Sequence, residues 1–586
     1  MAANSALVVS NLDFETIRKD LVTFLSSQTK FQDYDFEGSN IGVLLDILSY
    51  NTHMNNFYTN MAISEMFLDS AQIRDSVVSR AKELNYMPRS NRSAVAYVDI
   101  TVNPNDAPAT ITIPRGTAFS SRIDNSIYTF VTKNPIIVTS SNGYTAVNTP
   151  IYEGSYVTET FFVNSSISNQ RFVLNNANID TSSIQLTVQN SYNDTTSVEF
   201  IQAQSLLGFN SSSKIFFIQA GDKNRYELVF GNGTIGVAPI NGNLINVTYR
   251  VCKGSIPNGA TTFTPTTSIA GYATANITVT TNVAAYGGAE PETIESIKFN
   301  APRHYQTQER AITLDDYRTI LLAEYPDIRA INVYGGETVY PPQYGSVFIS
   351  VDLLSYVGVP DILKETITAF IRSKMPISIE PFVIPAEYTY VDVAITASYN
   401  LNASSKTEND IKNLITQTVS AFNVEYLNNY NKTLRYSKLA AAVDNSDSSI
   451  VTSNLVTQMI KKISPTSGVE QLFSLDYQNP IIAASLSSGY FLYGGILSQL
   501  KDIGNSNEIA LVSIAGDVLK HNIGTIDYTT GIASINIPPL DSYVGDSINV
   551  YASATTNDFL VKNNTVVLID NGDINVIVSA VRAWKI

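Results

Sequence analysis

The spacing of apolar residues changes several times along this chain, and these changes limit the possible folds more than any other feature. Up to residue 87, apolar side chains recur at steps of three and four, as on one face of a helix. Between residues 93 and 285 they alternate at a period of two, and Asn-Gly and Pro-x-Gly turns separate the runs, as in antiparallel hairpins. The two periods belong to different kinds of element, so the chain predicts a multidomain α+β protein.

Three helices are expected in the N-terminal segment: one over residues 11–25, a second from Ser39 onward and a third that ends before Pro88. The first helix carries an apolar stripe made of Phe14, Ile17, Leu21 and Phe24. In one interpretation the stripe is the core of a small bundle packed on the rest of the chain. In the other, it is an interface that pairs with a helix of a partner.

Beyond residue 285, helices and strands alternate. A helix that begins near Pro291 is expected to end before Pro302, and Thr313 with Asp316 resembles a capping box at the start of the next helix. Further helices are predicted at 360–375, 408–422 and 437–444, and strands at 328–334, 346–354, 388–399 and 449–460. This alternation predicts compact α+β modules in the centre of the chain, followed by a β-rich C-terminal domain with turns at 528–531 and 571–572.

Five regions are therefore expected. They are a helical partner-binding segment at 1–90, antiparallel β-rich domains at 91–285, an α+β core at 286–385, a second α+β module at 386–465 and a β-rich C-terminal domain at 466–586.

The composition of the chain disfavours nucleic-acid binding, membrane binding and metal sites. Only 15% of the 586 residues are charged. The 37 Lys and Arg residues against 52 Asp and Glu residues give a net charge of −15, which disfavours binding to nucleic acid and to anionic membranes. The single cysteine, Cys252, excludes a multi-cysteine zinc site and fits a reducing compartment, and His53, His304 and His521 show no metal-ligand spacing. No cofactor, metal, signal peptide or membrane span is expected, and the chain is expected to be made and folded in the cytoplasm.

Three strings could suggest catalysis, and each has a plainer interpretation. The segment from Gly231 to Gly236 matches G-x-G-x-x-G, but no helix is expected after it, which favours a β-hairpin turn. Asp315 and Asp316 fit the first turn of a helix, where the dipole favours carboxylates. The polar cluster Arg303, His304, Glu309 and Arg310 fits a structural network or a subunit contact better than an active site. The chain is not expected to be an enzyme.

The most specific string runs from Tyr286 to Arg310, YGGAEPETIESIKFNAPRHYQTQER, and continues through Thr313-Leu-Asp-Asp-Tyr317. It resembles the core of the Baseplate J-like family. Shorter similar strings are IPRGTAF at 113–119, FGNGTIG at 230–236 and TLRYSKL at 433–439. The strings LNYMPR at 84–89 and IGTIDYTTG at 523–531 are similar to the wedge-protein subgroup of T-even-type phages. One departure is Gly-Gly-Ala-Glu at 287–290, where the family often has Gly-Gly-x-Asp.

The resemblance implies a structural protein of a contractile phage tail. Members of the family associate with themselves through two different contacts into a ring around the tail hub, and the ring relays the trigger for sheath contraction. The resemblance also implies that the N-terminal helices bundle with another wedge subunit, and that nearby surfaces contact the sheath-initiating and inner baseplate proteins. The expected location is the baseplate of the virion.

Two pairs of glycines, Gly287 with Gly288 and Gly335 with Gly336, bracket the central module and are candidate hinges for a ring that changes diameter. Both pairs also fit tight turns. An alternative function remains open, because 33 tyrosines also suit a tail adhesin or a glycan depolymerase. Those proteins are usually repetitive β-helical trimers, and no repeat of roughly 20–50 residues is visible here.

Overall fold

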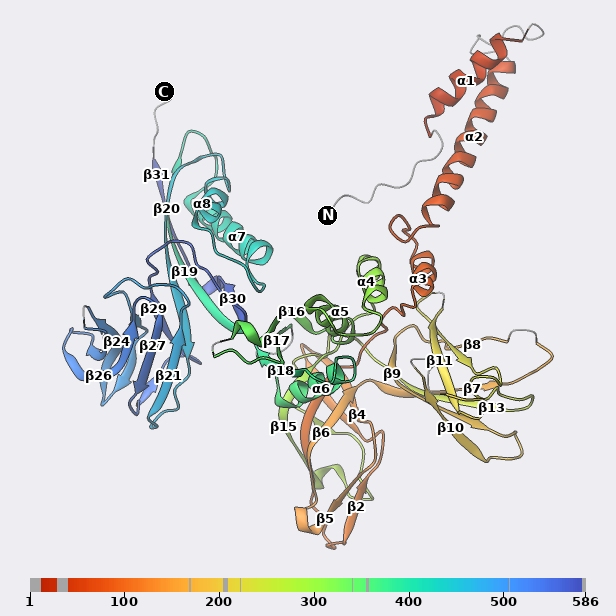
Figure 1. Cartoon of the computed structure of the whole chain (residues 1–586), viewed down its shortest axis with the longest axis horizontal. Helices are drawn as coiled ribbons and strands as arrows, with labels where there is room; N and C mark the ends of the chain where they lie inside the picture. The colour runs from red at the N-terminus through yellow and green to blue at the C-terminus, as the bar shows by residue number, and fades with distance from the viewer. Residues whose placement is uncertain are drawn as a thin grey trace. The chain divides into compact units, whose positions relative to one another are not determined.

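The computed structural model describes residues 12–28, 40–167, 170–203, 209–221, 223–339, 341–354, 358–504 and 506–581 (Figure 1). The chain forms two compact units. The first runs to Asp327 and takes in Leu354, and the second holds Ile328–Leu353 and the described residues from 358 onward. Helical and β-rich parts alternate as the sequence predicts, with helices first, sheets in the middle, α+β elements in the centre and sheets near the end.

The first unit begins with two helices, α1 (Phe14–Ser26) and α2 (Asn40–Ser64), shown in red in Figure 1. They are antiparallel, because Arg18 Nε lies 2.6 Å from Asp46 Oδ1 while His53 Nδ1 lies 2.9 Å from the Leu12 carbonyl oxygen. Asp13 caps α1, since its carboxylate accepts the Thr16 N–H at 2.9 Å. The third helix, α3 (Arg74–Glu83), ends before Pro88 as predicted.

A seven-stranded sheet, ordered β7-β13-β9-β10-β11-β12-β8, shares a core with two helices. Val77 and Ala81 of α3, together with Ile297 and Ala301 of α4 (Ile294–Thr307), are fully buried in the cluster that also holds the inward side chains of this sheet. The strands are β7 (Ser155–Phe162), β8 (Phe172–Val173), β9 (Ile179–Gln189), β10 (Ser197–Gln202), β11 (Ile215–Ala220), β12 (Tyr226–Phe230) and β13 (Leu244–Val251).

A six-stranded sheet with a separate core precedes and follows this sheet in the sequence, in the order β14-β3-β4-β6-β1-β15. Its residues alternate in burial; β1, for example, buries every second side chain. The strands are β1 (Val95–Val102), β3 (Ala118–Ile123), β4 (Ser126–Thr132), β6 (Thr145–Glu153), β14 (Thr264–Pro265) and β15 (Ile277–Tyr286), beside the two-stranded pair β2 (Thr110–Ile113) and β5 (Ile136–Thr139). The region 91–285 therefore contains two sheets with separate cores.

A buried polar cluster, which we call the joint, links the two sheets. Arg250 Nη2 on β13 lies 2.9 Å from Asp180 Oδ2 on β9, and both side chains are almost completely buried. The same Asp180 oxygen accepts a hydrogen bond of 2.7 Å from Ser93 Oγ, directly before β1. The Arg250 guanidinium also lies 4.3 Å from the centre of the Tyr152 ring on β6. An ion pair within the seven-stranded sheet thus contacts the six-stranded sheet through Ser93 and Tyr152.

Glu153, the last residue of β6, should make the joint sensitive to pH. Burial raises the pKa of its carboxyl to about 7, against the hydrogen bond from the Lys253 N–H and the charges of Lys253 and Arg250. Between pH 4.5, which is the ordinary pKa of the carboxyl, and about pH 7, Glu153 binds more protons in the folded chain than in the unfolded chain. The free energy of unfolding should therefore fall, by about 1–3 kcal/mol, as the pH rises through this window.

Denaturant titrations at about pH 5 and about pH 8 check this expectation. The free energy of unfolding should be higher at the lower pH in the wild type, and Glu153→Gln should remove most of that difference. The exposed carboxylate of Glu83 serves as the control, and Glu83→Gln should leave the difference intact. Equal pH dependence in the wild type and in Glu153→Gln would contradict the assignment.

Two helices of the predicted 286–385 core lie in the first unit. Helix α5 (Leu314–Glu324) begins with the predicted capping box, in which Asp316 accepts the Thr313 N–H at 2.8 Å and Thr313 Oγ1 accepts the Asp316 N–H at 3.3 Å. Helix α4 differs from the prediction because it continues through Pro302 to Thr307. The unit boundary at 327/328 divides the predicted core, since α4 packs in the core of the seven-stranded sheet and the following strands join the second unit.

The second unit starts with a three-stranded sheet of β16 (Ile328–Gly335), β17 (Ser346–Leu353) and β18 (Glu380–Pro385), on which α6 (Asp361–Arg372) packs. Two long strands follow, β19 (Glu387–Asn400) and β20 (Ile450–Ile463), which pair in antiparallel fashion. Helices α7 (Glu408–Tyr426) and α8 (Tyr436–Asp444) lie between them in the sequence and bury Ile415, Val419 and Leu439 in the same core. Strand β18 was not predicted, and the other elements begin and end within four residues of their predicted ends.

The predicted C-terminal domain is not separate from the module before it. Strands β30 (Thr565–Leu568) and β31 (Ile574–Val581) pair in parallel with β19, so the β-rich segment between β20 and β30 is an insertion in one continuous sheet. The inserted strands are β21 (Gln471–Asp476), β22 (Ser487–Ser488), β23 (Phe491–Tyr493), β24 (Ile496–Ile503), β25 (Glu508–Ser513), β26 (Val518–Asp527), β27 (Ile532–Ile537), β28 (Ser542–Tyr543) and β29 (Ile548–Ala552).

The predicted turns form, but the predicted hairpins do not. Gly116, Gly233, Gly242 and Gly259 all have positive φ, as tight turns require. The strands on either side of each turn are not paired with each other; β12 and β13, which flank Gly233 and Gly242, have different neighbours in the sheet. The G-x-G-x-x-G segment is therefore a loop with no helix after it, and its interpretation as a hairpin turn is wrong.

Candidate interaction surfaces

The distribution of side chains on α2 is inverted relative to an ordinary amphipathic helix. Its buried positions are mostly small or polar, namely Gly42, Leu45, Ser49, Asn60 and Ser64. Eight of its large apolar side chains are exposed instead, and these are Val43, Leu44, Ile47, Leu48, Tyr50, Phe57, Tyr58 and Met61. Leu44 and Ile47 are 57% and 58% exposed. We call these eight exposed residues the α2 apolar face.

A helix that carries apolar residues on every side is normally buried on every side. In this chain α1 covers only one side of α2, along the row that includes Leu45 and Ser49. The remaining apolar side chains stay open to solvent when all the described segments are in place. Contiguous exposed apolar surface of this kind typically marks a site of protein association.

The four residues predicted to face a partner lie on α1, and the structure separates them. Ile17 is buried and only 7% exposed, whereas Phe24 is 64% exposed. Phe14 and Leu21 are half-buried. Much of this stripe is thus accounted for by packing within the hairpin, and Phe24 is its open member. The assignment of all four to a partner remains a prediction.

Sequence reasoning placed the interface on α1 and missed the larger surface on α2. The signal was present, because the run Ile41-Gly-Val-Leu-Leu-Asp-Ile-Leu48 has apolar residues on more than one helical face. Leu45 is the one large apolar side chain of this run that is buried.

Local backbone conformation and close packing require glycine at most of the candidate hinge positions. Gly287 has a φ of +78°, with open space around the position of a Cβ atom. Gly288 has no such space, because a Cβ there would collide with the Gly254 carbonyl oxygen. A Cβ on Gly335 or Gly336 would meet the Glu337 carboxylate or the Gln343 carbonyl oxygen. Backbone geometry and close packing explain these glycines without motion, and the hinge role remains a prediction.

The residues considered for catalysis are used structurally. Asp316 caps α5, and Asp315 lies 2.7 Å from Arg318 on the exposed side of the same helix. Arg303 lies over the Phe299 ring, and His304 packs edge-on against Tyr86. Across the residues that the structure describes, no group of three or more His, Cys, Asp or Glu side chains is placed to hold a metal ion. None of the described helices has both the length and the apolar character needed to cross a membrane.

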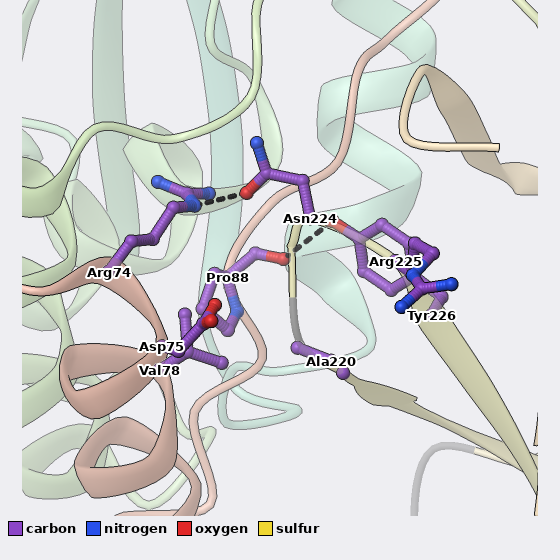
Figure 2. Close-up of a pocket in the computed structure, with 9 residues that line it drawn as sticks. Arg74, Asp75, Val78, Pro88, Ala220, Asn224, Arg225 and Tyr226 are labelled. Carbon is purple, nitrogen blue, oxygen red and sulfur yellow. Dashed lines mark hydrogen bonds between the residues drawn. The ribbon is translucent and has the colours of Figure 1, made fainter. Parts of the chain in front are cut away.

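A small hollow lies between α3 and the start of β12 (Figure 2). Its cavity volume is about 10 Å³, enough for roughly one water molecule. Arg74 donates to the Asn224 side chain across it, and Tyr226 OH donates to the Pro88 carbonyl oxygen at 3.4 Å. Arg74 also donates to the Glu292 carbonyl oxygen, and the buried Glu292 carboxylate accepts hydrogen bonds from Tyr86, Ser296 and Asn300 at 2.6–2.9 Å. These contacts fasten α3 to α4 and the sheet, and they leave no room for a substrate.

Three domain families match the chain. The helical domain of the baseplate wedge protein gp6-like family matches residues 13–86, which include the α1–α2 hairpin. C-terminal domain I of baseplate structural protein gp6 matches residues 313–384, and C-terminal domain III matches residues 387–462. Baseplate wedge protein gp6 of Enterobacteria phage T4 is 26% identical over 512 residues, which cover 82% of this chain and 74% of the relative. The chain resembles a baseplate wedge protein.

This resemblance to a wedge protein supports a structural subunit of a phage baseplate. Two solved assemblies were also compared with the chain. The baseplate of the anti-feeding prophage has a TM-score of 0.29 and 12% identity, with 75% of this chain and 85% of the other covered. The TssK-TssF-TssG baseplate subcomplex of a type VI secretion system has a TM-score of 0.31 and 7% identity, with 57% and 96% covered. Scores this low add no weight to the comparison.

Proposed function

We propose that this chain is a baseplate wedge subunit of a contractile phage tail that acts without chemistry of its own. It associates with itself through two different contacts into a ring around the tail hub, and the ring relays the trigger for sheath contraction. It is assembled in the host cytoplasm and resides in the tail baseplate of the virion. The observation that carries this proposal is the α2 apolar face, because exposed apolar side chains gathered on one helix typically mark a site of protein association.

In this proposal the α1–α2 hairpin bundles with helices of another wedge subunit. Two helices leave the outer side of α2 open, and a third and fourth helix would bury it, as in ordinary helix bundles. The contact is proposed for the α2 apolar face, and α1 supports it from the opposite side of α2. The sheath-initiating and inner baseplate proteins are further partners, and neither nucleic acid nor membrane is a partner. The resemblance of residues 13–86 to the gp6-like helical domain supports this use of the hairpin.

The alternative function, a tail adhesin or glycan depolymerase, gains no specific support. Such proteins usually stack parallel strands into long coils. The described strands instead form several mainly antiparallel sheets with separate cores.

A double substitution tests the proposed contact. Leu44→Asp with Ile47→Asp places two charges in the middle of the α2 apolar face and should abolish wedge complexes, because a buried unpaired charge costs several kcal/mol. The hairpin itself should still form, since both side chains are exposed. Native mass spectrometry and negative-stain microscopy of the chain, expressed with the neighbouring tail proteins, measure assembly.

The matched control adds the same two charges to exposed polar positions of α1, as Thr23→Asp with Ser26→Asp. This control should assemble normally. If the α2 variant assembles as well as the control and retains its helical circular dichroism, the α2 apolar face is not the contact. Turnover of a polysaccharide by the purified chain would contradict the proposed function itself.

A further inference from the structure

We propose that a basic hollow on the second unit binds an acidic peptide segment of a neighbouring protein. The hollow lies where α7 ends and α8 begins, and it has a cavity volume of about 250 Å³. It is lined by Phe422, Tyr426, Asn431, Lys432, Thr433, Arg435 and Lys438. The volume is just below that of typical small-molecule pockets, about 300–1,000 Å³, and suits one or two side chains of a peptide.

Three cations surround this hollow. Lys432, Arg435 and Lys438 are all exposed, and none forms an ion pair of 4 Å or less with a described carboxylate. Many basic side chains elsewhere in the described chain are paired; Lys406 with Asp447 and Arg250 with Asp180 are examples. Three unpaired cations around one concave surface form a concentrated positive site in a chain whose net charge is −15.

Two aromatic rings line the hollow. Phe422 and Tyr426 follow each other by one turn of α7, with ring centroids 5.0 Å apart, and Phe422 is buried in the core. This burial fixes Phe422, and Tyr426 packs on it. The Lys438 Nζ atom lies 5.9 Å from the centre of the Tyr426 ring, within the range of a cation–π contact. The two rings can therefore pack the CH₂ groups of a ligand while Lys432, Arg435 and Lys438, which we call the rim, bind its charge.

The fold holds the rim in place. Leu434 and Leu439 are fully buried, so the segment between them, which carries two of the three cations, is anchored at both ends. Asp558 Oδ1 accepts the Tyr436 N–H at 2.9 Å and positions the first turn of α8. A preorganised rim loses little side-chain and loop entropy when it binds.

An acidic peptide fits these features better than the alternatives. Glutamate and aspartate have both a carboxylate for the cations and an aliphatic stem for the rings. Nucleic acid would need a wider basic surface, and the acidic remainder of the chain would repel it. A purely structural role is the main competitor, because cations beyond the end of α7 also complement its dipole. That role predicts a change in stability, whereas binding predicts a change in affinity.

The test uses the full chain and a fluorescently labelled decaglutamate peptide as the probe, measured by anisotropy at low salt. The wild type should bind the peptide, and a decaglutamine peptide should not bind. The triple variant Lys432→Gln, Arg435→Gln and Lys438→Gln should weaken binding by about tenfold or more, because each charge contributes to a salt-screened attraction. Its melting temperature should stay that of the wild type.

The matched control neutralises three exposed lysines of the same unit, as Lys412→Gln, Lys501→Gln and Lys520→Gln. This control should bind the peptide as the wild type does. Leu44→Asp with Ile47→Asp should also bind normally, which separates this inference from the proposed wedge contact. Tyr426→Ala should weaken binding by a few-fold through the loss of packing.

Four results would overturn the inference. The wild type could fail to bind decaglutamate, or the lysine control could lose as much affinity as the triple variant. An oligothymidylate of similar length could bind more tightly than the peptide and displace it, which would make the hollow a nucleic-acid site. Finally, the triple variant could melt at a lower temperature with unchanged affinity, which would make the cations structural.

Discussion

Replacing Asp180 by Ala is expected to lower the free energy of unfolding of the first unit by about 3–5 kcal/mol. The substitution leaves the Arg250 guanidinium buried at the joint without its counter-charge, and its side chain is only 2% exposed. It also removes the acceptor of hydrogen bonds from Ser93 and Ser182, at 2.7 and 2.6 Å. Because these bonds reach both sheets, the loss should affect the two sheets together.

The same substitution should change the acid sensitivity of the chain. Burial alone would raise the pKa of Asp180, but the charge of Arg250 and the hydrogen bonds from Ser182, Arg250 and Ser93 hold it below its usual value. A carboxylate with a depressed pKa stabilises the folded state above its unfolded pKa, and this stabilisation is lost as the pH falls. The wild type should therefore lose more stability on acidification than Asp180→Ala does.

Denaturant titrations of the wild type and variants measure both effects. Asp361 pairs with Lys364 at 2.8 Å on the surface and is 91% exposed. Asp361→Ala is the control, which should cost less than about 1 kcal/mol. A cost for Asp180→Ala no greater than that of the control would mean that the joint does not depend on its ion pair.

The second large effect is expected at Gly288. Gly288→Ala should destabilise the first unit by about 1–3 kcal/mol or more, because the new methyl group collides with the Gly254 carbonyl oxygen and approaches the Asn258 side chain. Gly287→Ala should cost about 1 kcal/mol, since it meets open space and loses only the freedom to adopt a φ of +78°. Thermal unfolding of the two single variants gives the ranking.

The two variants also separate a turn from a hinge. If the pair is only a tight turn, particles with Gly287→Ala should assemble and contract at the rate of the wild type. If the pair is a hinge, Gly287→Ala should slow contraction despite its small effect on stability. Sheath contraction in purified particles, followed by electron microscopy, distinguishes these outcomes. Equal costs for Gly287→Ala and Gly288→Ala would contradict the packing argument.

Local features of the fold could be predicted well from the sequence. The Thr313 capping box, the helix over 408–422 and the strand over 328–334 depend on nearby residues, and each formed close to its expected ends. The turn at Tyr528–Gly531 is also confirmed, because the Gly531 N–H donates to the Asp527 carbonyl oxygen at 2.8 Å and Gly531 has a positive φ. These signals are encoded within one or two turns of chain.

Long-range pairing could not be predicted in the same way. The Asn-Gly turns have the predicted backbone conformation, but which strands become neighbours depends on packing across the whole sheet. The boundary at 327/328 and the union of β19 with β31 likewise depend on contacts between distant residues. Pro302 was expected to end α4, but the helix continues, and Ala301 is fully buried in the core beside it.

The candidate interaction surfaces were likewise predictable in their local features and unpredictable in their long-range packing. Helical spacing identified the apolar residues of the N-terminal segment, yet only the packing of α1 against α2 decides which of them are covered. The string at 433–439 contains Arg435 and Lys438, but nothing in the sequence indicates that Phe422 and Tyr426 line the same hollow.

The insertion between β20 and β30 has a consequence for the order in which the protein is made. Strand β19 cannot complete its edge until residues 574–581 have left the ribosome, about 180 residues later. The partners of the inserted strands are mostly close in sequence, so these strands can pair before β31 is available to β19. The sheet of the second unit should thus be completed only after β31 has been made, and a chain stopped before β31 would carry an open strand edge prone to pair with other chains.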